Sequence, residues 1–256
     1  MRYCYLLVVM VFFACKSTQP VATSQPSIGG PAWAALWQQR AAEYRALCFQ
    51  AYQLAGERVE VMSHQQTLRP RAIVTDIDET VLDNSPYTAK TTLEGKTWSQ
   101  ATWEEWTSKA ACDTVPGAPS FFKYAAEKGF TIYYVTNRLE NERAATLKNL
   151  QRYNFPFADN EHLILSNGNS NKEERRDAIA KKYEIAMLVG DNLGDFSEDF
   201  YRKTPAERNA AVERLHELFG TRFIMLPNAM YGDWLSALVP KGANADSALR
   251  KAIRTE

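Results

Sequence analysis

The chain has 256 residues, with 30 Lys and Arg against 30 Asp and Glu, so its formal net charge at pH 7 is zero. This balance excludes a basic nucleic-acid-binding protein and an acidic disordered chain. Hydrophobic residues make up 45% and charged residues 23%, a composition typical of globular proteins. Four cysteines are too few and too scattered for a disulfide scaffold or a zinc finger. Cys48 and Cys112 are expected as small buried side chains, and a disulfide between them is left open.

The N-terminal residues have the composition of an export signal. A single basic residue is followed by an apolar run over 5–14, which is too short for a helix that spans a bilayer core of about 30 Å. Cys15 follows this run directly, and the next stretch is polar and rich in Ser, Thr, Pro and Gly. We therefore expect a lipoprotein signal peptide over 1–14, lipid on Cys15 and a flexible tether over 15–31. An ordinary cleaved signal peptide is the alternative.

Residues 32–256 are expected to form one domain with alternating helices and strands. A long helix is predicted from Trp33 to about Val61, because apolar residues recur there at spacings of three and four. Short apolar runs predict five buried strands, at 72–75, 131–136, 162–166, 185–190 and 223–226. Four further helices are predicted at 119–128, at 140–153, at 172–183, and from the capping pair Thr204–Pro205 to Gly220. This order predicts an α/β fold with a Rossmann-like parallel sheet flanked by helices, an insertion over 84–115 after the first strand, and an added N-terminal helix.

Acidic and polar side chains follow four of the predicted strands. In chain order they are Asp76, Asp78, Thr136, Asn137, Lys172, Asp191 and Asp195. Ligands bind at the carboxyl ends of the strands in such a sheet, so these side chains are expected to converge. Carboxylates packed together repel one another, which implies a bound cation, and oxygen ligands with room for water favour Mg²⁺.

These motifs, in this order, resemble the haloacid dehalogenase (HAD) superfamily of phosphohydrolases. DIDET at 76–80 matches its Asp-x-Asp-x-Thr motif, and VTNR, Lys172 and GDNLGD match the other three. Longer segments are similar to the class C acid phosphatases, also called the lipoprotein-type 5′-nucleotidase family. They are ALWQQRAAEYRALCFQAY, DIDETVLDNSPY, TWEEW, VPGA, YYVTNR, GDNLGDF and LPNAMYGDW. The likeness covers about residues 32–239 and implies an HAD-like fold with acid phosphatase activity.

The chemistry of phosphate monoester hydrolysis suggests two catalytic roles. Asp76 is expected to attack phosphorus and form an aspartyl phosphate, and Asp78 to protonate the leaving oxygen and then deprotonate a water molecule. The resemblance implies that Mg²⁺ is held by the carboxylates of Asp76 and Asp191 and by the main-chain carbonyl of Asp78. It also implies that Asp195 orients metal-bound water or Lys172 without binding the metal itself.

Three groups are expected to bind the phosphoryl oxygens: the hydroxyl of Thr136, the main-chain N–H of Asn137 and the ammonium of Lys172. Alternatives to these predictions stay open. They are a helix cap at Thr136, an N-cap at Asp195, and Arg175 or Arg176 in place of Lys172.

Trp103 and Tyr231 are the candidates for the leaving-group side of the site. The resemblance implies that a nucleobase stacks between aromatic rings, which would give broad use of nucleoside monophosphates and of other small phosphomonoesters. Packing of both rings onto the core is the alternative. The predicted partners are such a substrate and, through lipid on Cys15, a membrane, with no nucleic acid polymer and with a homodimer left open. The predicted location is a bacterial cell envelope, with the outer membrane favoured.

Other functions compete with this interpretation. A haloalkanoate dehalogenase would use Asp76 but needs no acid for its leaving group, so Asp78 argues against it. A non-enzymatic surface lipoprotein on an HAD scaffold would not need the complete set of motif residues. A broad acid phosphatase without a nucleotide preference is the third alternative.

Overall fold

The computed structural model describes residues 29–239 and 242–255. The predicted signal peptide, Cys15 and most of the predicted tether lie outside these ranges. Among the helices of the described ranges, none is both long and apolar enough to cross a membrane.

Five parallel strands form the central sheet, in the order β5-β4-β1-β6-β7. Their bounds are β1 Arg71–Thr75, β4 Thr131–Leu139, β5 Leu163–Ser166, β6 Glu184–Gly190 and β7 Phe223–Met225. The predicted parallel sheet is confirmed. The strand predicted to end at Thr136 runs three residues further, because Leu139 pairs with Ser166 after an irregularity in register.

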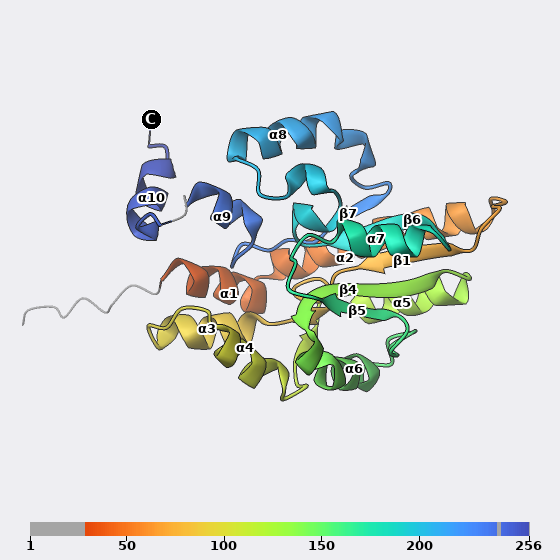
Figure 1. Ribbon diagram of the computed structural model, residues 1–256, viewed down its shortest axis with the longest axis horizontal. Helices are drawn as coiled ribbons and strands as arrows, with labels where there is room; N and C mark the ends of the chain where they lie inside the picture. Colours follow the sequence, from red (N-terminus) through yellow and green to blue (C-terminus); the bar gives the residue numbers. More distant parts are fainter. Residues whose placement is uncertain (1–28, 240–241, 256) are drawn as a thin grey trace, which may run out of the picture.

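Helices cover both faces of this sheet (Figure 1). The helices α2 (Ala42–Ser63) and α5 (Ala118–Glu127) share a hydrophobic core with Ile73 and Ile132, while α7 (Glu173–Ala180) packs with Val74 and Tyr133 on the other face. Successive side chains of β1 and β4 therefore point to opposite faces, as the geometry of a strand requires. Of the remaining helices, α6 (Arg143–Arg152) contacts β5, and α8 (Pro205–Arg214) packs against the 3₁₀ turn Glu198–Phe200.

The single N-terminal helix predicted over 33–61 is wrong, because α1 (Gly30–Arg40) and α2 are separate helices. Ala41 between them has an extended backbone, with φ −77° and ψ 128°. The apolar face predicted for the first part is also wrong, since Trp33 is 60% exposed. The buried face of α1 includes Gln38, whose amide donates to the Asp83 carboxylate at 2.7 Å. Tertiary packing on the inserted segment has thus overridden the local helical pattern.

The other predicted helices are present with shorter or irregular ends. The segment predicted as a helix over 140–153 begins with the 3₁₀ turn Glu140–Glu142, and the helix predicted to run to Gly220 ends at Arg214, before the 3₁₀ turn His216–Leu218. The capping box at the start of α8 is confirmed, because the Thr204 hydroxyl accepts a hydrogen bond from the main-chain N–H of Glu207 at 3.3 Å.

The inserted segment supplies two helices, α3 (Ser85–Leu93) and α4 (Gln100–Thr107). A short antiparallel pair of strands, β2 (Leu82–Asp83) and β3 (Asp113–Thr114), closes the segment. Together with α1, α9 (Asp233–Leu238) and α10 (Ala245–Ala252), these helices lie at one end of the molecule, beyond the carboxyl ends of the strands (Figure 1). Cys48 and Cys112 are both free and buried, as expected.

Candidate active site

Three buried aspartates meet at the carboxyl ends of two adjacent strands. Asp76 follows β1, while Asp191 and Asp195 follow β6, and each offers an oxygen within 4.8 Å of the others. The main-chain N–H of Asp76 donates to the carbonyl of Val189 at 2.9 Å, which holds the two strand ends together. The ammonium of Lys172, at the N-cap of α7, contacts Asp76 Oδ1 and lies 2.7 Å from Asp195 Oδ1. Convergence of these four predicted residues is therefore observed.

Burial sets the charge state of this cluster. It raises the pKa of Asp76 to about 7, against the opposing effect of Lys172. It also raises the pKa of Asp191 well above its usual range, and the charges of Asp195 and Asp76 add to that shift. Burial lowers the pKa of Lys172, but Asp195 and Asp76 more than compensate, so the pKa is raised and the ammonium stays charged.

The donor set fits a divalent metal ion. Three carboxylates face one ammonium in a buried site, which leaves excess negative charge that a divalent cation would neutralise. Carboxylate oxygens suit hard ions such as Mg²⁺. The observed cluster contains two of the predicted metal ligands, the carboxylates of Asp76 and Asp191. The third predicted ligand, the main-chain carbonyl of Asp78, stays a prediction.

The carboxylates are held by further contacts that orient them. Asp191 accepts from the Thr80 hydroxyl at 3.2 Å and from the Asn228 amide at 2.8 Å. Asp195 Oδ2 accepts from the main-chain N–H of Asn192 at 3.0 Å, while its Oδ1 faces Lys172. Asp195 is the last residue of the 3₁₀ turn Leu193–Asp195, and the following turn, Glu198–Phe200, is capped by Ser197, so the alternative of an N-cap at Asp195 is wrong.

Gly190 makes room for the Asp195 carboxylate. A Cβ atom at this position would lie 2.4 Å from Asp195 Oδ2, much closer than real contacts allow. Any side chain here would therefore displace Asp195 from Lys172. The glycine at the end of β6 is therefore a requirement of the site.

The two arginines of α7 hold loops rather than Asp76. Arg175 donates to the carbonyl of Thr136 at 2.5 Å and to the side-chain oxygen of Asn137 at 2.7 Å. Arg176 donates to the carbonyl of Asp195 at 2.8 Å. Lys172 is thus the α7 side chain that contacts Asp76, while the arginines fix the segments after β6 and at the end of β4.

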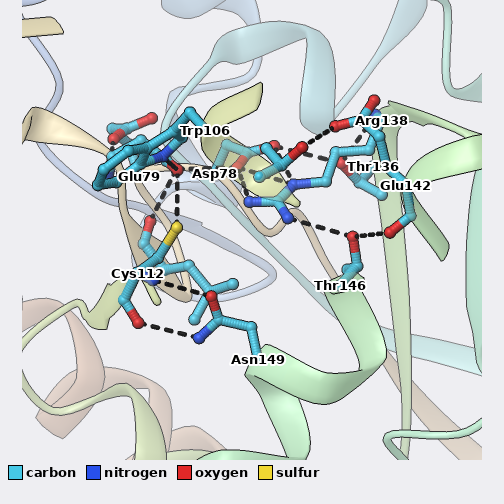
Figure 2. Close-up of polar contacts among 12 residues, drawn as sticks. Asp78, Glu79, Trp106, Cys112, Thr136, Arg138, Glu142, Thr146 and Asn149 are labelled. Atoms are coloured by element: carbon cyan, nitrogen blue, oxygen red, sulfur yellow. Dashed lines mark hydrogen bonds and ion pairs between the residues drawn. The ribbon is translucent and has the colours of Figure 1, made fainter. Parts of the chain in front are cut away.

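The carboxyl of Asp78 points toward a different set of partners (Figure 2). Arg138 Nη2 donates to Asp78 Oδ1 at 2.7 Å, and the Asn84 amide donates to the same oxygen at 2.9 Å. The Thr136 hydroxyl lies 3.4 Å from Asp78 Oδ2 and accepts from the main-chain N–H of Arg138 at 3.1 Å. Thr136 lies within β4, so the alternative of a helix cap there is wrong.

A cavity of about 830 Å³ connects these residues to the helices at the end of the molecule. Asp76, Asp78 and Lys172 line it, together with the predicted substrate-binding residues Trp103 and Tyr231. Asn137 also lines it and is exposed, and the position of its main-chain N–H as a phosphate ligand stays a prediction.

The two aromatic candidates differ in how they are held. Trp103 is 9% exposed, packs edge-on against Tyr87 with ring centroids 5.2 Å apart, and lies 5.8 Å from the guanidinium carbon of Arg138. Tyr231 is half-buried, and its hydroxyl oxygen is buried with no hydrogen-bond partner among the described residues. Both rings line the cavity, and their role in binding a base stays a prediction.

Several residues of the site were not predicted from the sequence. Arg138 is part of the VTNR motif, and a charged residue two positions after a buried threonine in a strand is a signal that could have identified it. Asn84 directly follows the short strand β2, and its contact with Asp78 depends on how that segment folds. Thr80 belongs to the DIDET motif and Asn228 to LPNAMYGDW, but the sequence does not assign either a partner, because their contacts with Asp191 depend on the tertiary fold.

The comparisons with known proteins identify the family of this chain. A model of the HAD superfamily, subfamily IIIB (acid phosphatase), matches residues 14–234. The class C acid phosphatase from Bacillus anthracis is 38% identical to this chain, with a TM-score of 0.85 over 88% of this chain and 97% of that chain. A structure of that enzyme with tungstate bound matches equally well.

Plant proteins are similar over shorter segments. Acid phosphatase 1 from Solanum lycopersicum is 26% identical over 163 residues, covering 61% of this chain and 56% of that protein. The stem 31 kDa glycoprotein from Glycine max is 27% identical over 129 residues, covering 48% and 51%. The chain spans about half the length of these curated relatives. Because the family model covers most of the chain, the protein belongs to the acid phosphatases of HAD subfamily IIIB.

Proposed function

We propose that this protein hydrolyses phosphomonoesters, with nucleoside monophosphates as its preferred class of substrate. The observation that carries the proposal is the buried contact of Lys172 with Asp76, next to Asp191 and Asp195, on the lining of a cavity that also contains Asp78. Such a site combines a nucleophile, a second carboxyl group for proton transfer and positive charge for the phosphoryl oxygens.

In the first step, a carboxylate oxygen of Asp76 attacks phosphorus while the bond from phosphorus to the leaving oxygen breaks. Asp78 gives its proton to that oxygen, and the product is an alcohol with an aspartyl phosphate on Asp76. In the second step, water loses a proton to the Asp78 carboxylate and attacks phosphorus. Inorganic phosphate leaves, and both aspartates return to their starting states.

The other residues neutralise charge and hold the reacting groups. Lys172 and the groups at the end of β4, Thr136 and the main-chain N–H of Asn137, would bind the phosphoryl oxygens. Asp76 and Asp191 would hold Mg²⁺ together with the carbonyl of Asp78, and the ion would supply charge neutralisation for the attack of one anion on another. Asp195 would orient Lys172, which it contacts at 2.7 Å.

Asp78→Asn tests the proton-transfer role and therefore the proposed reaction. The change should lower kcat/KM for AMP by about 100-fold or more, because an alkoxide leaving group needs a proton. The loss for para-nitrophenyl phosphate should be smaller, since a phenolate leaves without one. An equal loss on both substrates would count against the general-acid role of Asp78.

The preference for nucleotides would come from the aromatic residues of the cavity. Phosphate binds in the same way whatever the leaving group, so discrimination must arise where Trp103 and Tyr231 line the cavity. Stacking contributes about 1–3 kcal/mol per base, which gives a preference of roughly tenfold to a hundredfold over an ester without a ring. The buried Tyr231 hydroxyl would also gain a hydrogen-bond partner from such a ligand.

Trp103→Ala and Tyr231→Ala should each lower kcat/KM for AMP by roughly tenfold and leave glycerol phosphate nearly unchanged. The measurement is the ratio of the two kcat/KM values in the wild type and in each variant. The exposed Trp33, on α1, provides a matched control as Trp33→Ala. A ratio that stays constant in both cavity variants would reduce the proposal to an acid phosphatase without a nucleotide preference.

We also propose that the protein is a lipoprotein of a bacterial cell envelope, anchored through Cys15. The support is the apolar run that ends at Cys15 and the polar tether that follows it. The predicted tether overlaps the start of α1, because Gly30 and Pro31 are helical. Pro31 lines the same cavity as Asp76, so a tether that precedes α1 would join the domain at the edge of the site.

Cys15→Ser should move the protein from the membrane fraction to the soluble envelope fraction without changing its specific activity. Lipid is the anchor in this proposal, and a flexible tether does not transmit strain to the site. Fractionation followed by a phosphatase assay measures both effects. Membrane association that persists in the variant would favour another anchor.

A further inference from the structure

One oxygen of the Asp78 carboxyl is held by two buried residues, Asn84 and Arg138, and Figure 2 shows Arg138 next to Asp78. Arg138 is 2% exposed, and Asn84 is fully buried. Arg138 donates to Asp78 Oδ1 from Nη2 at 2.7 Å and from Nε at 3.1 Å, and the Asn84 amide donates to the same atom at 2.9 Å. Three N–H groups therefore converge on Oδ1.

The second oxygen of Asp78 is held less tightly. Its nearest donors are Arg138 Nε at 3.3 Å and the Thr136 hydroxyl at 3.4 Å, both longer than usual hydrogen bonds. We propose that Asn84 and Arg138 are positioning residues, which hold Oδ1 so that Oδ2 of Asp78 is the atom that gives and takes the proton. This inference rests on the proposed function, in which Asp78 is the general acid and base.

The direction of the Asn84 amide is set by the inserted segment. The amide oxygen accepts from the indole N–H of Trp106 at 2.8 Å and from the thiol of Cys112 at 3.2 Å. An indole N–H can only donate, so the amide oxygen must face Trp106 and the amide nitrogen must face Asp78. Packing of α4 therefore decides which atom of Asn84 reaches the general acid.

A second chain of hydrogen bonds fixes Arg138 from the same helix. Arg138 Nη1 donates to the Thr146 hydroxyl at 3.1 Å, and that hydroxyl donates to the carbonyl of Glu142 at 2.8 Å. The Glu142 carboxylate accepts from the Thr107 hydroxyl of α4 at 2.9 Å. The inserted segment thus reaches the Asp78 carboxyl by two routes, and both end on Oδ1.

Charge also favours this arrangement. Burial lowers the pKa of Arg138, but the charge of Asp78 and the hydrogen bonds to it, together with Cys112 and Glu142, outweigh burial, so the pKa is raised and the guanidinium stays charged. A buried guanidinium with two donors on one oxygen restricts both the position and the rotation of the carboxyl. Lysine, with a single point charge, would preserve the charge and lose this restriction.

The test compares AMP with para-nitrophenyl phosphate in two conservative variants. Trp106→Phe keeps an aromatic ring and removes the N–H that orients Asn84, and Arg138→Lys keeps the charge and removes the paired donors. For AMP, kcat should fall about tenfold in Trp106→Phe and about 100-fold in Arg138→Lys, while KM stays nearly unchanged. For para-nitrophenyl phosphate, the fall in kcat should be several times smaller in both variants. A purely structural role would lower both rates together.

Controls separate this inference from the proposed function. Trp37→Phe removes an indole N–H near the core residue Tyr44, outside the cavity, and should leave the ratio of the two rates at its wild-type value. Arg138→Ala should regain part of its AMP activity when guanidinium ions are added, whereas Asp78→Asn should not. Circular dichroism is used to check that each variant is folded. If the Arg138 variants do not fold, the ratio of the two rates in Trp106→Phe alone tests the positioning role.

Two results would overturn the inference. Equal losses on both substrates in Trp106→Phe and Arg138→Lys, with a selective loss in Asp78→Asn, would remove the positioning role and keep the general acid. An equal loss in Asp78→Asn itself would overturn the proposed role of Asp78 and the positioning role with it.

Discussion

Asp76→Asn should abolish turnover of AMP and of para-nitrophenyl phosphate alike, by about four orders of magnitude or more, because an amide cannot attack phosphorus. The fold should be retained. Burial raises the pKa of Asp76 to about 7, so its ionised form is unfavourable in the metal-free protein, and a neutral amide of the same shape relieves that penalty. We expect a melting temperature equal to or above that of the metal-free wild type at pH 7.5.

Asp113→Asn provides a matched control for this change. Asp113 lies exposed in β3, away from the acidic cluster, and its substitution should leave both activity and stability near wild type. Mass spectrometry of the purified Asp76→Asn protein excludes deamidation as a source of activity. Retention of more than a few per cent of the wild-type rate would remove Asp76 as the nucleophile.

Removal of divalent metal with EDTA should also abolish activity, and added Mg²⁺ should restore it. Without the ion, burial favours the protonated form of Asp76, which cannot attack phosphorus, and its ionised form would face an anionic substrate with only Lys172 to offset the repulsion. The loss should be at least about 100-fold in kcat/KM on both substrates, since charge neutralisation serves the attack on phosphorus whatever the leaving group. Activity that survives exhaustive chelation would contradict a metal-dependent mechanism.

The same site predicts how stability depends on pH. The pKa of Asp76 is about 7 in the folded metal-free protein and about 4 in an unfolded chain. Between these values the folded state keeps a proton that the unfolded state has lost. The melting temperature of the metal-free protein should therefore fall as the pH rises from 4 to 7.

Metal binding must displace this proton, so the stabilisation by Mg²⁺ should be greater at pH 7.5 than at pH 5. At a concentration about 100 times the dissociation constant, the expected rise in melting temperature is about 5–10 °C at the higher pH. Asp191→Asn should lose most of this rise, and NaCl at equal ionic strength should not reproduce it. A rise of equal size at both pH values would contradict proton release on metal binding.

The sheet and the position of the site were predictable because both depend on local patterns. Short apolar runs marked the strands, and the residues just after them must lie at one edge of a parallel sheet. Asp76, Asp191 and Lys172 therefore converge as expected. Their distance apart in the sequence did not prevent this prediction, because the sheet itself brings the three residues together.

Features set by tertiary packing could not be predicted. The break at Ala41 carries no proline or glycine, and it exists because α1 packs on α3 while α2 packs on α5. The contact between Asp78 and Arg138 joins residues 60 apart in the sequence, and the contact between Asn84 and Trp106 depends on how the inserted segment folds. Hydrophobic periodicity contains no information about such polar partners.

The most direct test of the proposed mechanism is to trap the phosphorylated enzyme. Wild-type protein turning over AMP labelled with ³²P is quenched in acid, digested, and the labelled peptide is sequenced. We predict label on Asp76 that is released by hydroxylamine, as expected of an acyl phosphate, with no label in Asp76→Asn. Label on a different residue, or rapid turnover without labelled protein at any quench time, would contradict Asp76 as the nucleophile.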